Sequence, residues 1–184
     1  MDKRWEGKTV ACIASGPSLT YEDCARVESA GIPSIAVNNS WERARFSDIL
    51  FAADFAWWKR NFEGITIPAE RWTNNVQAAR VYGLNLQHKR KSLNSGLLAI
   101  KLAINLGAKI ILLLGYDAKI DNGTHWHGNH KLTKNPDAKR CDIWLRQFMM
   151  EDFGDITIIN CTPKSAINRF PRLGLVEAIE SFMP

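Results

Sequence analysis

Several features that would assign the chain to a familiar class are missing from its sequence. The longest apolar run, residues 110–114, is far shorter than the roughly 18 residues that a membrane-spanning helix needs. The segment 1–6 lacks the apolar stretch of a secretory signal. We therefore expect a protein without a membrane span that stays in the cytoplasm.

Cysteine pairs and glycine-rich phosphate motifs are also missing. The four cysteines are scattered and form no CxxC pair, so we expect free thiols, with Cys12 and Cys161 in the core. The chain contains neither a GxGxxG fingerprint nor a Walker loop, which disfavours ordinary dinucleotide and P-loop chemistry. A net charge of +5 suits an anionic partner, but it is equally common in proteins without one.

Short apolar runs alternate with helical patterns along the 184 residues. Strands are expected over 9–14, 33–37, 49–53, 109–114 and 156–160, with an edge strand at 71–74. Helices are expected over 20–30, 55–62, 94–105, 138–151 and 173–182, with a helical turn at 41–46 and no clear pattern over 75–93. This order predicts an α/β chain, residues 1–184 forming a single three-layer Rossmann-like domain with a mostly parallel sheet.

Polar or glycine-bearing segments follow the predicted strands. Because ligands of open parallel sheets bind outside the carboxyl ends of the strands, these segments are the candidate nucleotide site. Gly16 would let backbone approach a phosphate, Ser18 could donate its hydroxyl, and the helix beginning near Thr20 would add free N–H groups. Each segment also has a plain interpretation as a turn or a helix cap. The candidates are Gly16, Pro17, Ser18, Asn38, Asn39, Asp54, Asn94, Ser95, Gly96, Gly115, Tyr116, Asp117, Thr162 and Ser165.

Three of the four histidines fall within six residues, at His125, His127 and His130. One of them could act as a general base near neutral pH. The three could instead bind a metal together with Asp117 or Asp121, or the segment could be a polar surface loop. Among the aromatic residues, we expect one of the adjacent residues Trp57 and Trp58 in the core and the other near the surface.

The ordered motifs resemble a known superfamily. Gly16-Pro17-Ser18-Leu19 and Asn38 are similar to the start of the bacterial sialyltransferases of glycosyltransferase family 42. The same layout occurs in the domain-of-unknown-function 115 group, with its motility-associated factors and an archaeal pterin pyrophosphokinase. The resemblance continues through Asn94-Ser95-Gly96, Leu106-Gly107, Gly115-Tyr116-Asp117, Asp121-Asn122-Gly123-Thr124-His125 and Cys161-Thr162-Pro163-Lys164-Ser165-Ala166. It covers about residues 8–170, except for 62–92.

The resemblance implies roles for individual residues. Gly16, Ser18, Asn38, Ser95 and Gly96 would hold the cytidine monophosphate part of a donor. His127 or His130 would be the general base, and no metal or other cofactor would be required. The family's tyrosines that stabilise the leaving phosphate have no clear match, so Lys119, Trp126 or Lys131 would replace them. Asp54 stands where the family has asparagine, which favours a donor other than CMP-sialic acid.

The expected activity is therefore a nucleotide-sugar-dependent, inverting glycosyltransferase whose acceptor is a glycan, a protein or a nucleic acid. The pterin branch implies an alternative, a Mg²⁺-dependent pyrophosphokinase acting on a small alcohol, with Asp54, Asp117 or Asp121 as ligands. A third possibility is a non-catalytic accessory protein that binds nucleotides or nucleic acid. The sequence is also similar to small phage-encoded proteins, which implies the cytoplasm of a bacterium or a phage-infected host.

Overall fold

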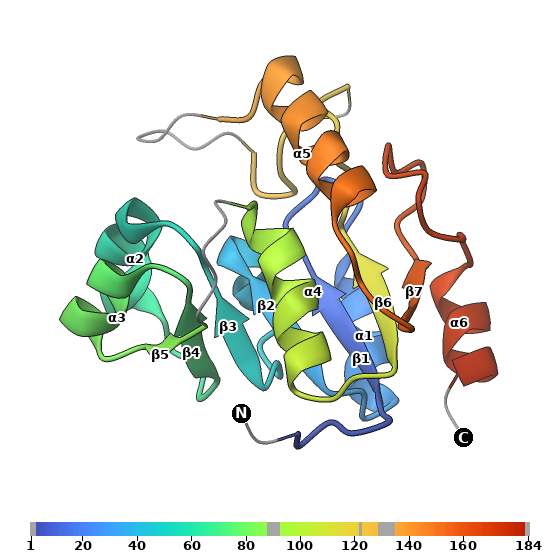
Figure 1. Cartoon of the computed structure of the whole chain (residues 1–184), viewed down its shortest axis with the longest axis horizontal. Coiled ribbons are helices and arrows are strands. Elements are labelled where there is room, and N and C mark those ends of the chain that lie inside the picture. The colour runs from blue at the N-terminus through green and yellow to red at the C-terminus, as the bar shows by residue number, and fades with distance from the viewer. Residues whose placement is uncertain (1–2, 88–92, 122, 129–134, 183–184) are drawn as a thin grey trace.

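The structure is a computed structural model that describes residues 3–87, 93–121, 123–128 and 135–182 (Figure 1). Seven described strands form one sheet in the order β5-β4-β3-β2-β1-β6-β7, and every pair of neighbours is parallel. The strands are β1 (Thr9–Ile13), β2 (Ser34–Val37), β3 (Ile49–Phe51), β4 (Glu70–Thr73), β5 (Asn85–Leu86), β6 (Ile110–Leu114) and β7 (Thr157–Asn160). This confirms the predicted Rossmann-like α/β fold.

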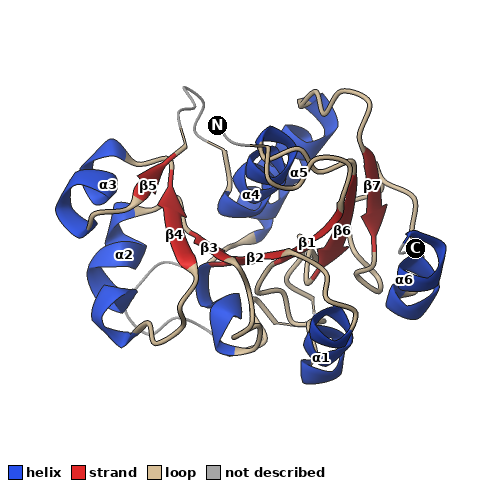
Figure 2. Cartoon of the chain, turned by 90° about the horizontal axis from the view of Figure 1, so that it is seen from below, coloured by secondary structure: helices blue, strands red, loops and turns tan. Residues whose placement is uncertain are grey.

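Helices cover both faces of the sheet and make the three layers (Figure 2). One face is packed by α1 (Tyr21–Ser29), α2 (Phe55–Asn61), α3 (Val76–Tyr82) and α6 (Leu175–Phe182), together with the short 3₁₀ helix η1 (Asn38–Glu42). The other face is packed by α4 (Ser95–Asn105) and α5 (Ala138–Met150). A second 3₁₀ turn, η2 (Phe62–Gly64), follows α2. No helix among the described residues is long and apolar enough to cross a membrane.

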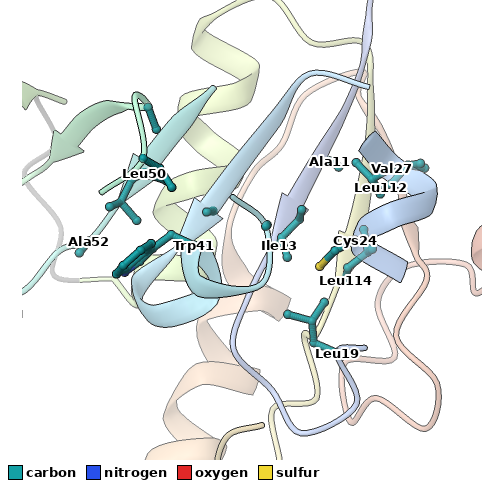
Figure 3. Packing of buried hydrophobic residues seen from close by; sticks show 14 of the residues in the cluster. Ala11, Ile13, Leu19, Cys24, Val27, Trp41, Leu50, Ala52, Leu112 and Leu114 are labelled. Atoms are coloured by element: carbon teal, nitrogen blue, oxygen red, sulfur yellow. The ribbon is translucent and has the colours of Figure 1, made fainter. Parts of the chain in front are cut away.

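Alternating side chains of the central strands pack into two separate hydrophobic cores, one on each face of the sheet. Ala11 and Ile13 of β1 face the α1 side, where Figure 3 shows Ile13 near Cys24 and Ala11 near Val27 of that helix. Val10 and Cys12 face α4 on the opposite side. Successive side chains of a strand point to opposite faces of the sheet, so a parallel strand that is buried on both faces needs apolar residues at every position. The four cysteines are buried free thiols, as expected.

Two predictions about the sheet and its connections were wrong, namely the strand at 71–74 as the edge of the sheet and the start of the helical turn at Trp41. The strand at 71–74 is not the edge, because β5 pairs with β4 and lies outside it. The segment 75–93, which gave no pattern, contains both α3 and β5. The two elements are 7 and 2 residues long, too short for a periodic signal. The helical turn after β2 begins at Asn38 rather than at Trp41.

The prediction for the paired tryptophans was also wrong, since both are buried. Trp57 and Trp58 are 7% and 0% exposed. The Trp57 indole N–H donates to Asn39 Oδ1 at 2.9 Å, and the Trp58 indole N–H donates to the Ala52 carbonyl at 2.9 Å. Neighbours on both sides of α2 therefore satisfy the two rings, which the sequence of the helix alone could not indicate.

Candidate functional site

A pocket opens where the order of the strands reverses. The chain builds β1 to β5 outward in one direction, then returns through α4 to β6, which pairs with the other side of β1. Ligands of open α/β sheets bind in the crevice at such a point. The enclosed part of the pocket holds about 120 Å³, and the hollow opens onto solvent. That enclosed volume is smaller than the roughly 300–1,000 Å³ of sites that bury a drug-sized ligand, so a larger ligand would extend into the open part.

The pocket brings together nine of the residues predicted from the sequence. They come from the ends of β1, β2 and β6, from the start of α4 and from the histidine loop: Gly16, Asn38, Asn94, Ser95, Gly96, Gly115, Tyr116, Asp117 and His125. Other candidates do not line it, namely Pro17, Ser18, Asn39, Asp54, His127, Thr162 and Ser165. His130 and Lys131 lie outside the described residues.

Close packing of protein against protein explains the glycines on the sheet side of the pocket. A Cβ atom at Gly16 would clash with the Asp117 carboxylate and the Gly115 carbonyl. The Gly16 N–H donates to the Gly115 carbonyl at 2.9 Å, which uses the group that we expected to meet a phosphate. At Gly96, a Cβ would lie 2.9 Å from the Tyr116 ring. We call Gly16, Gly96, Gly115, Tyr116 and Asp117 the floor of the pocket.

Tyr116 ties this floor together. Its hydroxyl donates to the Gly96 carbonyl at 3.0 Å, and burial raises the pKa of the phenol well above its ordinary value. Thr162 accepts the Tyr116 N–H at 2.9 Å, and the Ser165 hydroxyl donates to the Tyr116 carbonyl at 2.6 Å. Both hydroxyl-bearing residues are buried. In this structure Thr162 and Ser165 therefore shape the site through Tyr116 rather than line it.

Asp117 is a buried carboxylate on the pocket. It is only 5% exposed, and among the described lining residues it is the one acid. Burial raises its pKa above the ordinary value, while the Ser18 hydroxyl, 2.7 Å from Oδ2, opposes the shift. Ser18 thus reaches the site through Asp117. A negative charge here repels phosphate and favours hydroxyl or amine donors.

Asn38 provides a second acceptor on the same side. Its backbone has φ 52°, in the left-handed region that few residues other than glycine occupy. Its Oδ1 atom is buried without a hydrogen-bond donor from the described residues. Asparagine tolerates this conformation better than most residues, so the unsatisfied buried acceptor is the feature of Asn38 that points to a ligand. Asn39, by contrast, has a structural role, because it accepts from Trp57 and donates to Glu42 at 2.8 Å.

The histidine loop is fastened to the end of β1. The Trp126 N–H donates to the Ser15 carbonyl at 3.1 Å. The Arg43 guanidinium lies 4.1 Å from the centre of the Trp126 ring and 4.7 Å from that of Tyr21, close enough for cation–π attraction. These contacts hold Thr124 and His125 on the pocket wall. His125 and His127 have nearly parallel rings, with centroids 4.9 Å apart.

The opposite side of the pocket comes from residues that the sequence did not single out as a group. Lys119 lines the pocket and forms an ion pair with Asp121 at 2.9 Å. Helix α5, at the top of Figure 1, contributes Trp144 and Phe148. We call Lys119, His125 and Trp144 the roof of the pocket. The helix was predicted, but its position above the strand ends depends on long-range packing.

The metal hypothesis for the histidine loop gains no support from the described residues. No group of three His, Cys, Asp or Glu side chains among them could hold a metal ion.

Within the part of the chain that the structure describes, Trp126 lies on Arg43 rather than on the pocket. Of the three proposed replacements for the family's tyrosines, Lys119 is therefore the one that the structure brings to the site.

No protein-family model matches the chain, and no curated protein matches its sequence. The resemblance to the sialyltransferase-like superfamily therefore rests on the ordered motifs alone.

Proposed function

We propose that the pocket binds the nucleotide of a nucleotide-sugar and that the protein transfers the sugar to an acceptor hydroxyl. One observation carries this proposal: predicted residues from three strand ends, one helix start and the histidine loop converge on a single pocket where the strand order reverses. Segments as distant in sequence as Gly16 and Asp117 meet there.

The charges of the pocket favour one orientation of the nucleotide. Asp117 and Asn38 offer acceptors, which suit the hydroxyls of a ribose. The phosphates then lie away from Asp117 and toward Lys119, the cation among the described lining residues.

In the proposed reaction, His125 is the general base. Its neutral imidazole accepts the proton of the acceptor hydroxyl as the oxygen bonds to the anomeric carbon. The bond between that carbon and the phosphate oxygen breaks, and the nucleotide leaves with the electron pair. Lys119 stabilises the charge that develops on the leaving phosphate. Attack opposite the leaving group inverts the anomeric centre, and the proposed steps need no metal.

A ligand screen followed by two histidine variants tests the proposal. Thermal shifts are measured with CMP, UMP, CDP, UDP, GDP, ADP and ATP, with and without Mg²⁺. Ligand at 100 times its Kd should add about 2.7 kcal/mol to the free energy of unfolding. Turnover is then measured with sugars on the selected nucleotide. His125→Ala should lower kcat about 10²- to 10⁴-fold without changing nucleotide affinity, whereas the matched control His127→Ala should retain more activity.

The same measurements can contradict the proposed nucleotide site and the proposed base separately. If no nucleotide raises the melting temperature, the nucleotide site is wrong, and steeply salt-dependent DNA binding would favour the non-catalytic accessory protein. Full turnover in His125→Ala would remove His125 as the base while leaving the nucleotide site in place.

Pyrophosphoryl transfer from ATP to a small alcohol is a second candidate function, favoured by Asp117. Mg²⁺ in such sites is bound by one or two carboxylates together with substrate phosphates, and Asp117 presents a carboxylate to the pocket. Absolute dependence of turnover on Mg²⁺, with selective stabilisation by ATP, would support this activity over glycosyl transfer.

A further inference from the structure

Aromatic side chains of α5 form one wall of the pocket. Phe148 is 3% exposed and packs edge-on against Tyr116, with ring centroids 6.2 Å apart. Trp144 stands one helical turn before Phe148, so both point from the same face of α5. Phe148 completes the core, whereas Trp144 remains partly exposed at the pocket.

The other tryptophans are held in place by the core, by a hydrogen bond or by a stacked cation, and Trp144 differs from them. Trp5, Trp41, Trp57 and Trp58 are buried in the two cores. Trp72 donates to Glu70, and Trp126 packs on Arg43. Among the described residues, Trp144 has neither a hydrogen bond, nor an aromatic or cation–π partner, nor a place in either core. A large flat side chain with no internal partner on a pocket wall suits a planar ligand group.

We propose that Trp144 stacks on the base of the bound nucleotide and that the base subsite lies against α5. This inference rests on the proposed function and adds the order of the subsites. The base lies against Trp144, the ribose hydroxyls meet Asp117 and Asn38, and the phosphates extend toward Lys119. Since every base has a π face, stacking supplies affinity with little selection among bases.

Fragments of the ligand separate the base subsite from the rest of the pocket. The probes are the nucleotide selected by the screen, its nucleoside, and ribose 5-phosphate, which lacks a base. Loss of one stacked base costs about 1–3 kcal/mol. Trp144→Ala should therefore raise the Kd of the nucleotide and of the nucleoside about 5- to 150-fold. The Kd of ribose 5-phosphate should not change, and Trp144→Phe should keep most of the affinity.

A surface variant on the same helix is the matched control. Met149 is 61% exposed and lies outside the pocket lining, so Met149→Ala should bind all three probes like the wild type. The melting temperature of ligand-free Trp144→Ala should stay close to that of the wild type. If that variant fails to fold, the fluorescence of Trp144→Phe decides: the nucleotide-induced change seen in the wild type should be much reduced.

The outcomes distinguish this inference from the function on which it rests. Absence of nucleotide binding to the wild type overturns the proposed function. Unchanged nucleotide affinity in Trp144→Ala, with binding to the wild type intact, overturns the base subsite alone. An equal loss of ribose 5-phosphate affinity would mean that Trp144 shapes the whole pocket, which also contradicts base stacking.

Discussion

The floor and the roof of the pocket are built in different ways. On the floor, Gly16 packs against the Asp117 carboxylate and the Gly115 carbonyl, and Gly96 packs against the Tyr116 ring, so neither glycine has space for another methyl group. On the roof, Lys119 and Trp144 are partly exposed side chains outside the two cores. The comparison teaches that the glycine motifs, which drew attention first, specify the shape of the site, whereas the groups available for chemistry come largely from the other side.

The largest loss of unfolding free energy is expected on the floor of the pocket, in the variant Gly16→Ala. The new methyl group would overlap the Asp117 carboxylate and the Gly115 carbonyl, and overpacking of this kind costs about 3 kcal/mol of unfolding free energy. Gly64→Ala is the control, because a Cβ atom there meets nothing within 4 Å, and it should stay within about 0.5 kcal/mol of the wild type. Urea denaturation measures both. Equal stability of the two variants would contradict the close-packed floor.

The second-largest loss of stability is expected when the hydrogen bond between Thr162 and the Tyr116 N–H is removed. Thr162→Val removes the acceptor of the buried Tyr116 N–H, and an unsatisfied buried donor costs about 1–3 kcal/mol. Thr66→Val serves as control, since Thr66 is exposed and accepts a hydrogen bond from the exposed Arg45. Both unfolding free energies are measured by denaturant titration. A loss of nucleotide binding in Thr162→Val without a loss of stability would instead indicate direct contact with the ligand.

Asp117 gives a smaller, pH-dependent effect. Its pKa is raised in the folded protein, so the folded state binds the proton more tightly than the unfolded state. Stability therefore falls as pH rises from about 4 through the folded pKa. Asp117→Asn should remove this decline and gain stability relative to the wild type between about pH 4 and pH 7. Unfolding is followed across this range, with the exposed Asp54→Asn as control. A parallel pH profile for Asp117→Asn and the wild type would rule out the buried, destabilised carboxylate.

The smallest change in stability is expected on the roof. Lys119→Ala breaks a partly exposed ion pair with Asp121, which is worth at most about 1 kcal/mol. The same variant should weaken nucleotide binding about tenfold, or about 1.4 kcal/mol, if Lys119 faces the phosphates. Lys139→Ala, an exposed change on α5, is the control. Strong destabilisation by Lys119→Ala would erase the distinction between floor and roof.

The sequence indicated more of the sheet than of the site. The continuous apolar run 110–114 predicted the buried strand β6, and the predicted helix start near Thr20 matches α1, where Thr20 forms a capping box with Asp23. The strand-end rule then gathered Asn38 and Asp117 correctly on one pocket. It could not separate Asn38 from Asn39, because one residue of 3₁₀ helix turns the second side chain toward Trp57.

On the roof, Lys119 and His125 were among the predicted residues, but the place of Trp144 was beyond sequence reasoning for a different reason. Trp144 has an ordinary helical context, and only the path of α5 over the strand ends brings it to the pocket. Likewise, Arg43 and Trp126 are separated by about 80 residues, and no local pattern joins them. Placement of this kind is decided by packing between distant segments, for which a single sequence carries no periodic signal.

The position of β1 in the middle of the sheet has a consequence for synthesis on the ribosome. β1 pairs early with β2, but its other neighbour, β6, begins at Ile110. The open edge of β1 therefore stays uncovered while about 100 more residues are made, and exposed strand edges of nascent chains promote misassociation. The pocket lies along this seam between β1 and β6. The pocket is therefore complete only once segments from both halves of the chain have come together.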